Sequence, residues 1–174
     1  MARPAAFLDR DGTVVEDVHY ARNIEQIRLL PGAVQVLSDL RRRGFVLVIV
    51  TNQSGIGRGL LTESDFRAQT EHLARLLGPA AAPDATYYCP HHPTEALPPY
   101  QVVCRCRKPS PGLIERATAE LGLDPARSLA IGDKERDVEC ARAAGVRACV
   151  RMGTESVPTL AAAAALALSE LSRE

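Results

Sequence analysis

Residues 7–13 read Phe-Leu-Asp-Arg-Asp-Gly-Thr and continue an apolar run that begins at Ala5. Side chains at positions i and i+2 of a strand point the same way, so Asp9 and Asp11 can face one small site where the strand ends. Two carboxylates this close raise each other's proton affinity. A divalent cation with hard oxygen ligands is the usual compensation. The pair therefore suggests a Mg²⁺-assisted site in which one carboxylate attacks and the other handles a proton.

Apolar strands and amphipathic helices alternate along the rest of the chain. Residues 45–50 form a continuous apolar, β-branched run, which is typical of a strand buried on both faces of a parallel sheet. The same patterns predict strands over 5–8, 85–88, 128–131 and 146–150, and helices over about 34–43, 62–77, 112–121, 135–144 and 160–171. This order predicts an α/β fold: a Rossmann-like open parallel sheet with helices on both faces, in one domain over residues 1–174. Phe66, Leu73, Leu76 and Leu77 are expected on the inner face of the second helix.

Polar residues follow several of these strands. Asp9, Thr51, Cys89 and Asp133 each fall at or directly after a predicted strand end. Ligands of open parallel sheets bind beyond the carboxyl ends of the strands, so these residues are expected to meet at one edge. The long connector over about residues 14–31, called here the flap, is positioned to fold over that edge.

The segment after the most buried strand reads Thr51-Asn52-Gln53-Ser54-Gly55. Its hydroxyl and amide groups suit phosphate oxygens, and a polar turn that merely caps the strand explains them about equally well. Residues 55–59, Gly-Ile-Gly-Arg-Gly, do not have the G-x-G-x-x-G spacing of a dinucleotide loop. We expect a flexible connector on which no helix starts, with Arg58 a weak candidate for a substrate contact.

Two further segments add charge to the same edge. Arg107 and Lys108 precede a helix, where they form either a solvated basic turn or the fixed cation that a phosphoryl site needs. Asp133 is placed to complete a metal site with Asp9, and the alternative is a helix N-cap. Asp137 lies one turn further on and could support the metal or cap the helix.

Three cysteines and a histidine lie close together as Cys89-x-His91 and Cys104-x-Cys106. This pattern fits a closed tetrahedral Cys₃His zinc site, which has no open position for water and is therefore structural. Reduced cysteines in a loop are the alternative. The pattern predicts a zinc-binding loop over residues 89–106, called here the zinc loop, that aims Arg107 and Lys108. Cys140 and Cys149 are most simply small buried hydrophobes.

Composition excludes several other classes of function. The net charge is zero, aromatic residues make up 4% and there is no Trp, so nucleic-acid binding has little support. No apolar run approaches the roughly 20 residues of a membrane span. The start of the chain is too short and too soon charged for a signal peptide, which favours a cytoplasmic protein. We expect a monomer.

Four motifs in this order resemble the haloacid dehalogenase superfamily of phosphatases: Asp9-x-Asp11-Gly-Thr13, Thr51 after a buried strand, Lys108 before a helix, and Gly132-Asp133-x-x-x-Asp137. The stretches at 9–13, 51–55, 89–93 and 104–109 additionally resemble the heptose-bisphosphate phosphatases, a family similar to the histidinol-phosphate phosphatases. The resemblance implies that the substrate is a small phosphorylated sugar, D-glycero-D-manno-heptose 1,7-bisphosphate, which loses its 7-phosphate. Histidinol phosphate is the alternative substrate. Many relatives carry a cap domain, and no insertion of that size follows Thr13 or Thr51, so an open site is expected.

The resemblance also implies a role for each matching residue. Asp9 would be the nucleophile, Asp11 the general acid and base, and Thr51 and Lys108 the groups that hold the transferring phosphoryl group. Mg²⁺ would bind the Asp9 carboxylate, the Asp11 backbone carbonyl and Asp133. The implied substrate contacts are Asp17, Val18, His19, Tyr20, Asn52, Gln53, Ser54, Arg107 and Lys134, and the implied zinc ligands are Cys89, His91, Cys104 and Cys106. A non-catalytic protein with this fold is disfavoured because every expected catalytic residue is present.

Overall fold

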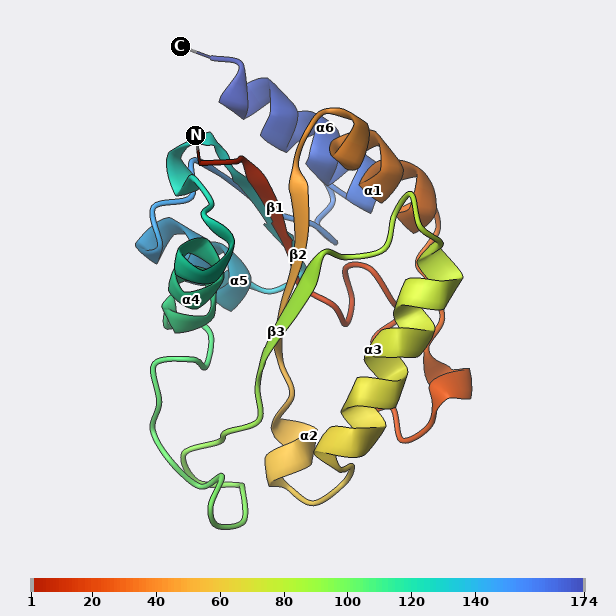
Figure 1. The fold of residues 1–174 in the computed structure, drawn as a ribbon, viewed down its shortest axis with the longest axis vertical. Coiled ribbons are helices and arrows are strands. Elements are labelled where there is room, and N and C mark those ends of the chain that lie inside the picture. The colour runs from red at the N-terminus through yellow and green to blue at the C-terminus, as the bar shows by residue number, and fades with distance from the viewer. Residues whose placement is uncertain (1, 174) are drawn as a thin grey trace.

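The computed structural model describes residues 2–173, which form a five-stranded parallel sheet in the order β3-β2-β1-β4-β5 (Figure 1). Its strands are β1 (Ala5–Leu8), β2 (Val46–Asn52), β3 (Ala85–Cys89), β4 (Leu129–Gly132) and β5 (Ala148–Arg151). The chain crosses from β2 and β3 on one side of β1 to β4 and β5 on the other. The predicted open parallel sheet is therefore confirmed.

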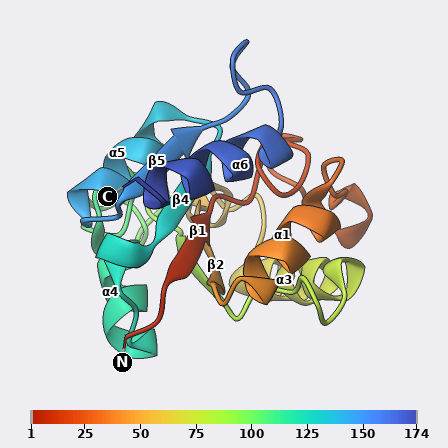
Figure 2. The same ribbon diagram turned by 90° about the horizontal axis from the view of Figure 1, so that it is seen from above.

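Helices cover both faces of the sheet (Figure 2). One face carries α1 (Ala33–Arg42), α3 (Glu63–Leu77) and α6 (Leu160–Leu171), and the other carries α4 (Gly112–Leu121) and α5 (Glu135–Ala143). The short elements are α2 (Ser54–Gly57), η1 (Ile24–Gln26) and η2 (Pro125–Arg127). Among the described residues, no helix has both the length and the apolar character needed to cross a membrane.

The central strand β1 shows why the layers form. Ala6 and Leu8 pack into the core under α1 and α6, whereas Ala5 and Phe7 pack into the core under α4 and α5. This period of two places an apolar side chain on each face of the sheet, so every residue of β1 is buried. Leu8 lies opposite Ile49 of β2 and Ile131 of β4, and this register fixes where the next residue, Asp9, leaves the sheet.

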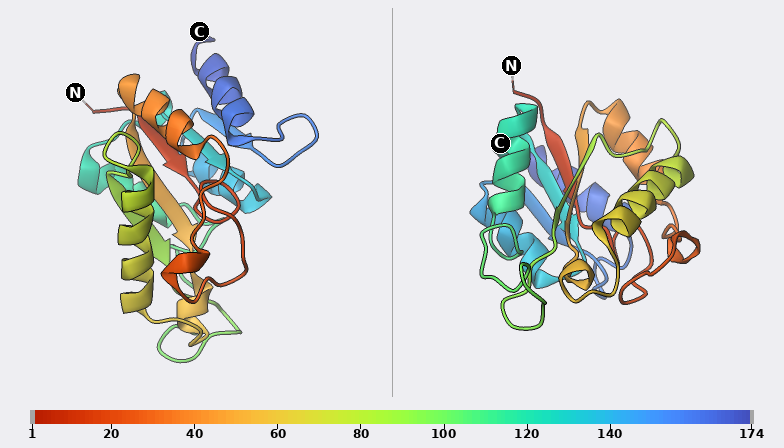
Figure 3. Two further views of the ribbon diagram at one scale, coloured as in Figure 1. Left: turned by 90° about the vertical axis from the view of Figure 1, so that its right-hand side faces the viewer. Right: turned by 60° about the horizontal axis from the view of Figure 1, so that its bottom comes forward.

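Loops gather at the carboxyl ends of the strands, where the flap, α2 and the zinc loop surround the edge of the sheet (Figure 3). The flap is held to the first loop by isolated bridges that pair Val15 with both Asp11 and Leu29. No domain-sized cap follows Thr13 or Thr51 within the described part of the chain, since α1 and α3 come soon after these residues.

Two expectations about local structure were wrong. Leu76 is not on the inner face of α3, because the buried positions Phe66, Gln69, Leu73 and Leu77 leave it 41% exposed. The stretch after Gln53 is not a connector without a helix, because α2 begins at Ser54. A Cβ at Gly57 would lie 2.4 Å from the Pro90 carbonyl oxygen, so glycine permits close packing on the zinc loop here.

Candidate active site

A cavity of about 290 Å³ opens at the carboxyl edge of the sheet. Its lining residues are Asp9, Arg10, Asp11, Asp17, His19, Tyr20, Thr51, Asn52, Gln53, Ser54, Arg58, Arg107, Lys108, Lys134 and Arg136. The structure thus brings the predicted nucleophile, acid, phosphate-binding residues and most substrate contacts to one place. Val18 is the exception among the predicted substrate contacts, since it does not line the cavity.

Lys108 lies at the bottom of the site with its side chain 3% exposed. Its Nζ is 2.6 Å from Asp9 Oδ1, 2.7 Å from Asp137 Oδ1 and 2.7 Å from the Val50 carbonyl oxygen. A buried ammonium needs such partners because its desolvation is costly. The Asn52 side chain holds the backbone of Lys108, accepting from its N–H at 3.0 Å and donating to its carbonyl oxygen at 3.2 Å. The predicted substrate contact Asn52 therefore positions Lys108 in this structure.

Burial and charged neighbours shift the pKa values of Asp9 and Lys108. Burial raises the pKa of Asp9 to about 6, with Asp137 and Asp11 adding to the rise and Lys108 opposing it. Burial alone would lower the pKa of Lys108, but Asp9 and Asp137 outweigh it and hold that pKa above its ordinary value. Lys108 therefore stays a cation, and Asp9 needs a further positive charge to be an anion over a wider pH range.

Asp9, Asp133 and Asp137 each offer a carboxylate oxygen within 4.8 Å of the others. Asp133 Oδ1 is buried and has no hydrogen-bond partner among the described residues. Gly12 has a φ of 81°, and a Cβ there would lie 2.5 Å from Asp133 Oδ2. Glycine therefore allows the first loop to pack closely against the Asp133 carboxylate. An oxygen cluster with an unpartnered buried acceptor fits a hard divalent cation.

The structure decides between the roles left open for the last motif. Lys134, not Asp133, is the N-cap of α5, so Asp133 is not a helix cap. Asp137 caps the helix, because its Oδ2 accepts from the Lys134 N–H at 3.0 Å. Its other oxygen faces Lys108. Lys134 Nζ lies 2.6 Å from Asp133 Oδ2 and is half exposed at the cavity.

The carboxylate of Asp11 points away from this cluster. Arg10 donates to both of its oxygens, from Nε to Oδ2 and from Nη2 to Oδ1, each at 3.0 Å. Gln53 Nε2 donates to Asp11 Oδ2 at 2.8 Å and to Thr51 Oγ1 at 2.9 Å. The amide of Gln53, predicted to bind substrate, thus donates to Asp11 and Thr51, two residues predicted to be catalytic.

The flap residues reach the cavity through unusual backbone conformations. His19 and Tyr20 have φ values of 58° and 74°, the left-handed region that non-glycine residues seldom adopt. The Tyr20 ring packs against Gly55, where a Cβ would be 2.7 Å from Tyr20 Cδ1. The Arg58 guanidinium lies 5.6 Å from the centre of the same ring and forms an ion pair with Glu95 of the zinc loop. Strain of this kind often accompanies a functional site.

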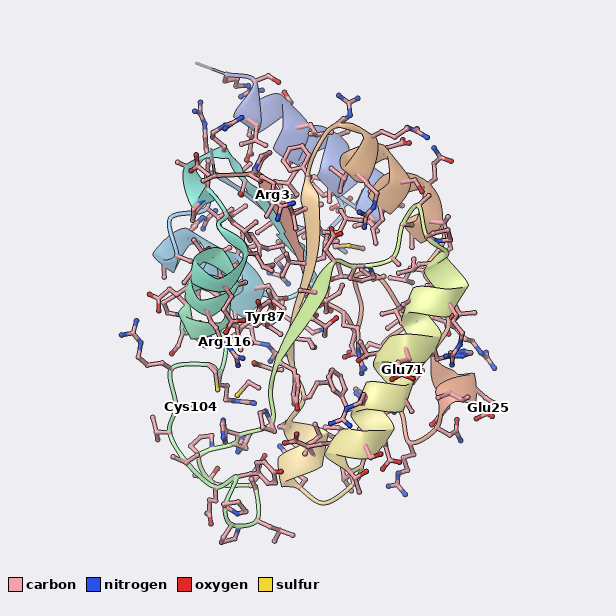
Figure 4. The ribbon with its side chains drawn as sticks, viewed as in Figure 1. Arg3, Glu25, Glu71, Tyr87, Cys104 and Arg116 are labelled. Carbon is pink, nitrogen blue, oxygen red and sulfur yellow. The ribbon has the colours of Figure 1, made fainter. Side chains whose placement is uncertain are left out.

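The predicted zinc ligands come together at the base of the zinc loop, where Figure 4 labels Cys104. The three Sγ–Sγ distances are 3.1, 3.2 and 3.6 Å, and His91 Nδ1 lies 3.2 Å from Cys106 Sγ and 3.6 Å from Cys89 Sγ. Ligands of tetrahedral zinc at about 2.3 Å would be about 3.8 Å apart, which these spacings approach. Burial and the hydrogen bond with Cys106 raise the pKa of the Cys89 thiol, so a bound cation is needed to hold the Cys89 sulfur as a thiolate. Cys140 is fully buried and Cys149 is half-buried, as expected of small hydrophobes.

Sequence reasoning missed some residues of the site. Arg10 lies inside the first motif without a predicted role, although a charged residue between two carboxylates that are predicted to be catalytic is a signal. Gln69 is 1% exposed on the inner face of α3, and its position three residues after Phe66 could have identified it as a buried polar group. Arg136 lies at an unspecified position inside the motif from Gly132 to Asp137 and lines the cavity without any distinguishing pattern.

Comparisons with known proteins identify the family of this chain. The haloacid dehalogenase-like hydrolase family matches residues 3–145. The chain is 41% identical to the D-glycero-beta-D-manno-heptose-1,7-bisphosphate 7-phosphatase of Escherichia coli O6:H1 over 97% of this chain and 90% of that protein. The D,D-heptose 1,7-bisphosphate phosphatase of B. bronchiseptica, solved with magnesium and phosphate, has 30% identity and a TM-score of 0.81, covering 96% of this chain and 99% of that one. A HAD-like phosphatase from Mesorhizobium loti also has 30% identity, with a TM-score of 0.89 over 99% of this chain and 89% of that one. The chain belongs to the haloacid dehalogenase-like hydrolase family.

Proposed function

We propose that this chain is a Mg²⁺-dependent phosphatase that removes the 7-phosphate of D-glycero-D-manno-heptose 1,7-bisphosphate. The observation that carries the chemistry is the contact of Lys108 Nζ with Asp9 at the bottom of an open, cation-lined cavity. The identity of 41% over nearly the whole chain to an enzyme named for this reaction supports the substrate.

The chain's own residues account for the steps. An Asp9 oxygen attacks phosphorus and forms an aspartyl-phosphate while the bond from phosphorus to the sugar oxygen breaks. Asp11 gives its proton to that leaving oxygen, then takes a proton from the water that hydrolyses the intermediate. Lys108 and Thr51 hold the charged phosphoryl oxygens. Asp9, Asp133 and the Asp11 backbone carbonyl would hold Mg²⁺, which supplies positive charge at the transferring group when it is bound.

The open side of the cavity suits a substrate with a second phosphate. Four cationic residues line this cavity in addition to Lys108, which is paired with Asp9 and Asp137: Arg58, Arg107, Lys134 and Arg136. We assign substrate recognition to the polar groups that face the cavity: Asp17, His19, Tyr20, Ser54, Arg107 and Lys134. Val18 stays a predicted contact without a place in the cavity.

We further propose that Cys89, His91, Cys104 and Cys106 bind a structural zinc ion. The four ligands leave no open position, so zinc would fix the loop rather than react. The loop is tied to the site by the hydrogen bond from Arg107 Nη1 to the His91 carbonyl oxygen, at 3.0 Å. Free thiols in such a set suit a reducing compartment, which supports the predicted cytoplasmic location. The monomeric state and the single domain over 1–174 stay predictions.

A kinetic comparison tests the proposed substrate. The two anomers of heptose 1,7-bisphosphate and histidinol phosphate are assayed with Mg²⁺, and kcat/KM is expected to be highest for one of the bisphosphates. A preference for histidinol phosphate would replace the substrate and keep the reaction class. Absence of turnover on all three, and on p-nitrophenyl phosphate, would contradict the phosphatase and favour a non-catalytic protein.

A further inference from the structure

Arg10 is a buried cation, and its one carboxylate contact among the described residues is with its neighbour in sequence, Asp11. The residue is 3% exposed, and its guanidinium lies 5.1 Å from the centre of the Phe66 ring. Both oxygens of Asp11 accept hydrogen bonds from it, and its remaining contacts are the amide oxygens of Gln53, at 3.2 Å, and Gln69, at 3.1 Å. A guanidinium withdrawn from water in this way is strongly tied to the one anion that pairs with it.

The contact between Arg10 and Asp11 fixes the orientation of the Asp11 carboxylate as well as balancing its charge. A guanidinium that binds both oxygens of a carboxylate determines the plane and the direction of that carboxylate, which a lysine cannot do. The Asp11 side chain is 26% exposed at the cavity, and its carboxylate is held by hydrogen bonds from Arg10 and Gln53, so its orientation depends on these two residues.

Arg10 is in turn fixed by a residue of α3 that also holds the flap. Gln69 Oε1 accepts from Arg10 Nη1 at 3.1 Å, and Gln69 Nε2 donates to the Ala21 carbonyl oxygen at 2.7 Å. Ala21 is buried and directly follows His19 and Tyr20, the two flap residues with positive φ that line the cavity. A continuous set of hydrogen bonds therefore runs from the flap through α3 to the carboxylate of Asp11.

We propose that Arg10 is the positioning residue for Asp11 and that Gln69 makes this position depend on the flap. The proposal deepens the proposed function, because it rests on Asp11 as the proton donor to the leaving oxygen. To donate, Asp11 carries the proton on Oδ1 in place of the contact with Arg10 Nη2, while Arg10 Nε and Gln53 Nε2 still hold Oδ2. Substrate that displaces the flap moves the Ala21 carbonyl, and with it the Gln69 amide that orients Arg10. Neither residue touches the reacting atoms, so both act through Asp11.

The leaving group separates this role from a merely structural one. An alkoxide leaves slowly without a proton, whereas p-nitrophenolate leaves readily without one. The kcat/KM value reports the steps up to departure of the leaving group, so a displaced Asp11 slows an alkyl phosphate and spares p-nitrophenyl phosphate. General damage to the site slows both substrates equally.

The experiment compares Arg10→Met, Arg10→Lys and Gln69→Met on the best alkyl phosphate from the kinetic comparison and on p-nitrophenyl phosphate. We expect Arg10→Met to lower kcat/KM for the alkyl phosphate about 100-fold, Arg10→Lys to lower it about 10-fold and Gln69→Met to have an effect of similar size to Arg10→Lys. All three should leave the value for p-nitrophenyl phosphate within about threefold of the wild type. Glu71→Met, on the exposed face of α3, is the matched control and should match the wild type on both substrates.

Parallel losses on both substrates, or no loss on either, would overturn the proposal. A crystal structure of Arg10→Lys or Gln69→Met gives a readout independent of turnover and of the unfolding that Arg10→Met risks. The Asp11 carboxylate should turn from its observed direction while the contact between Lys108 and Asp9 is kept, and an unmoved Asp11 would refute the proposal. Failure of the wild type on every phosphate ester would count against the proposed function alone, since the orientation of Asp11 is still decided by the structures.

Discussion

Two ligand clusters lie at the same edge of the sheet and differ in almost every physical property. The first consists of Asp9, Asp133 and Asp137, of which Asp9 and Asp137 pair with the buried Lys108 and Asp9 lines an open cavity. The second consists of three thiols and an imidazole that face one another at the base of the zinc loop. The oxygen cluster keeps one side open for a substrate, whereas the sulfur cluster is closed by its own ligands. Closure suits a structural role and an open side suits catalysis.

The sulfur cluster is adjacent in the chain to Lys108, which pairs with two members of the oxygen cluster. Cys106 is followed at once by Arg107 and Lys108, so the residue proposed to hold the phosphoryl group is two positions from a proposed zinc ligand. The zinc loop has little regular secondary structure to fix it otherwise. The comparison predicts that damage to the oxygen cluster abolishes chemistry without altering the loop, and that damage to the sulfur cluster alters both.

The largest effect is expected from Asp9→Asn, because the amide cannot form the aspartyl-phosphate. The kcat value should fall on the order of 10⁴-fold or more. Zinc content should stay near one per chain, since Asp9 is not part of the sulfur cluster. Steady-state kinetics and metal analysis measure the two quantities. The control is Asp39→Asn on the exposed surface of α1, and turnover that survives in Asp9→Asn would remove Asp9 as the nucleophile.

Mg²⁺ removal should be nearly as damaging and fully reversible. Hard carboxylate ligands bind Mg²⁺ weakly, whereas a closed thiolate set binds zinc tightly. Dialysis against a mild chelator should therefore abolish activity while zinc is retained, and added Mg²⁺ should restore it without refolding. Activity and zinc content are followed through one cycle of removal and return. Recovery that required zinc instead of Mg²⁺ would reverse the assignment of the two clusters.

Cys104→Ala should reduce activity by an intermediate amount, because damage to the sulfur cluster should also disturb residues at the oxygen cluster. Loss of a ligand should release the zinc ion, lower the melting temperature and reduce kcat about 10- to 100-fold through the displaced Arg107 and Lys108. Cys149→Ala is the matched control, because that thiol lies in β5 outside the cluster. Metal analysis, thermal unfolding and kinetics report the three effects. Zinc retained at full stoichiometry would show that the four residues are not a metal site.

Most members of the two clusters could be predicted from the sequence, because they lie at short, characteristic spacings along the chain. The paired Asp9 and Asp11 follow a buried strand, and the Cys-x-His and Cys-x-Cys pairs have the separation of metal ligands. The strand order places Asp133 beside Asp9, and parallel topology with a right-handed crossover makes that inference possible.

Several contacts of the site could not be predicted, because they join segments that are far apart in the sequence and have no motif in common. The contact of Lys108 with Asp137 and the set that joins Ala21, Gln69 and Arg10 arise only from packing. Leu76 is a further case, because it lies two helical turns after the buried Gln69 on nearly the same side of α3 and is still 41% exposed, which an apolar pattern alone does not show. Spacing in the sequence therefore indicates which residues form the clusters, whereas tertiary packing determines which side chains contact and orient them.

The smallest effect on activity is expected from a change of pH, which should protonate Asp9 in the oxygen cluster and leave the sulfur cluster unchanged. Burial raises the pKa of Asp9 to about 6, and attack on phosphorus requires the deprotonated carboxylate. At low Mg²⁺, kcat/KM should therefore fall about tenfold per pH unit below about 6, because the fraction of ionised Asp9 falls by that factor. Saturating Mg²⁺ should move the midpoint to lower pH, since a cation beside Asp9 favours its charged form.

The sulfur cluster supplies the control for this pH profile. Zinc content measured at each pH should stay near one per chain, and return to neutral pH should restore full activity. The loss would then belong to protonation of Asp9 and not to release of zinc. A midpoint that does not move with Mg²⁺ concentration would indicate that the titrating group lies outside the oxygen cluster, because only a group in contact with the cation has its proton affinity lowered by it.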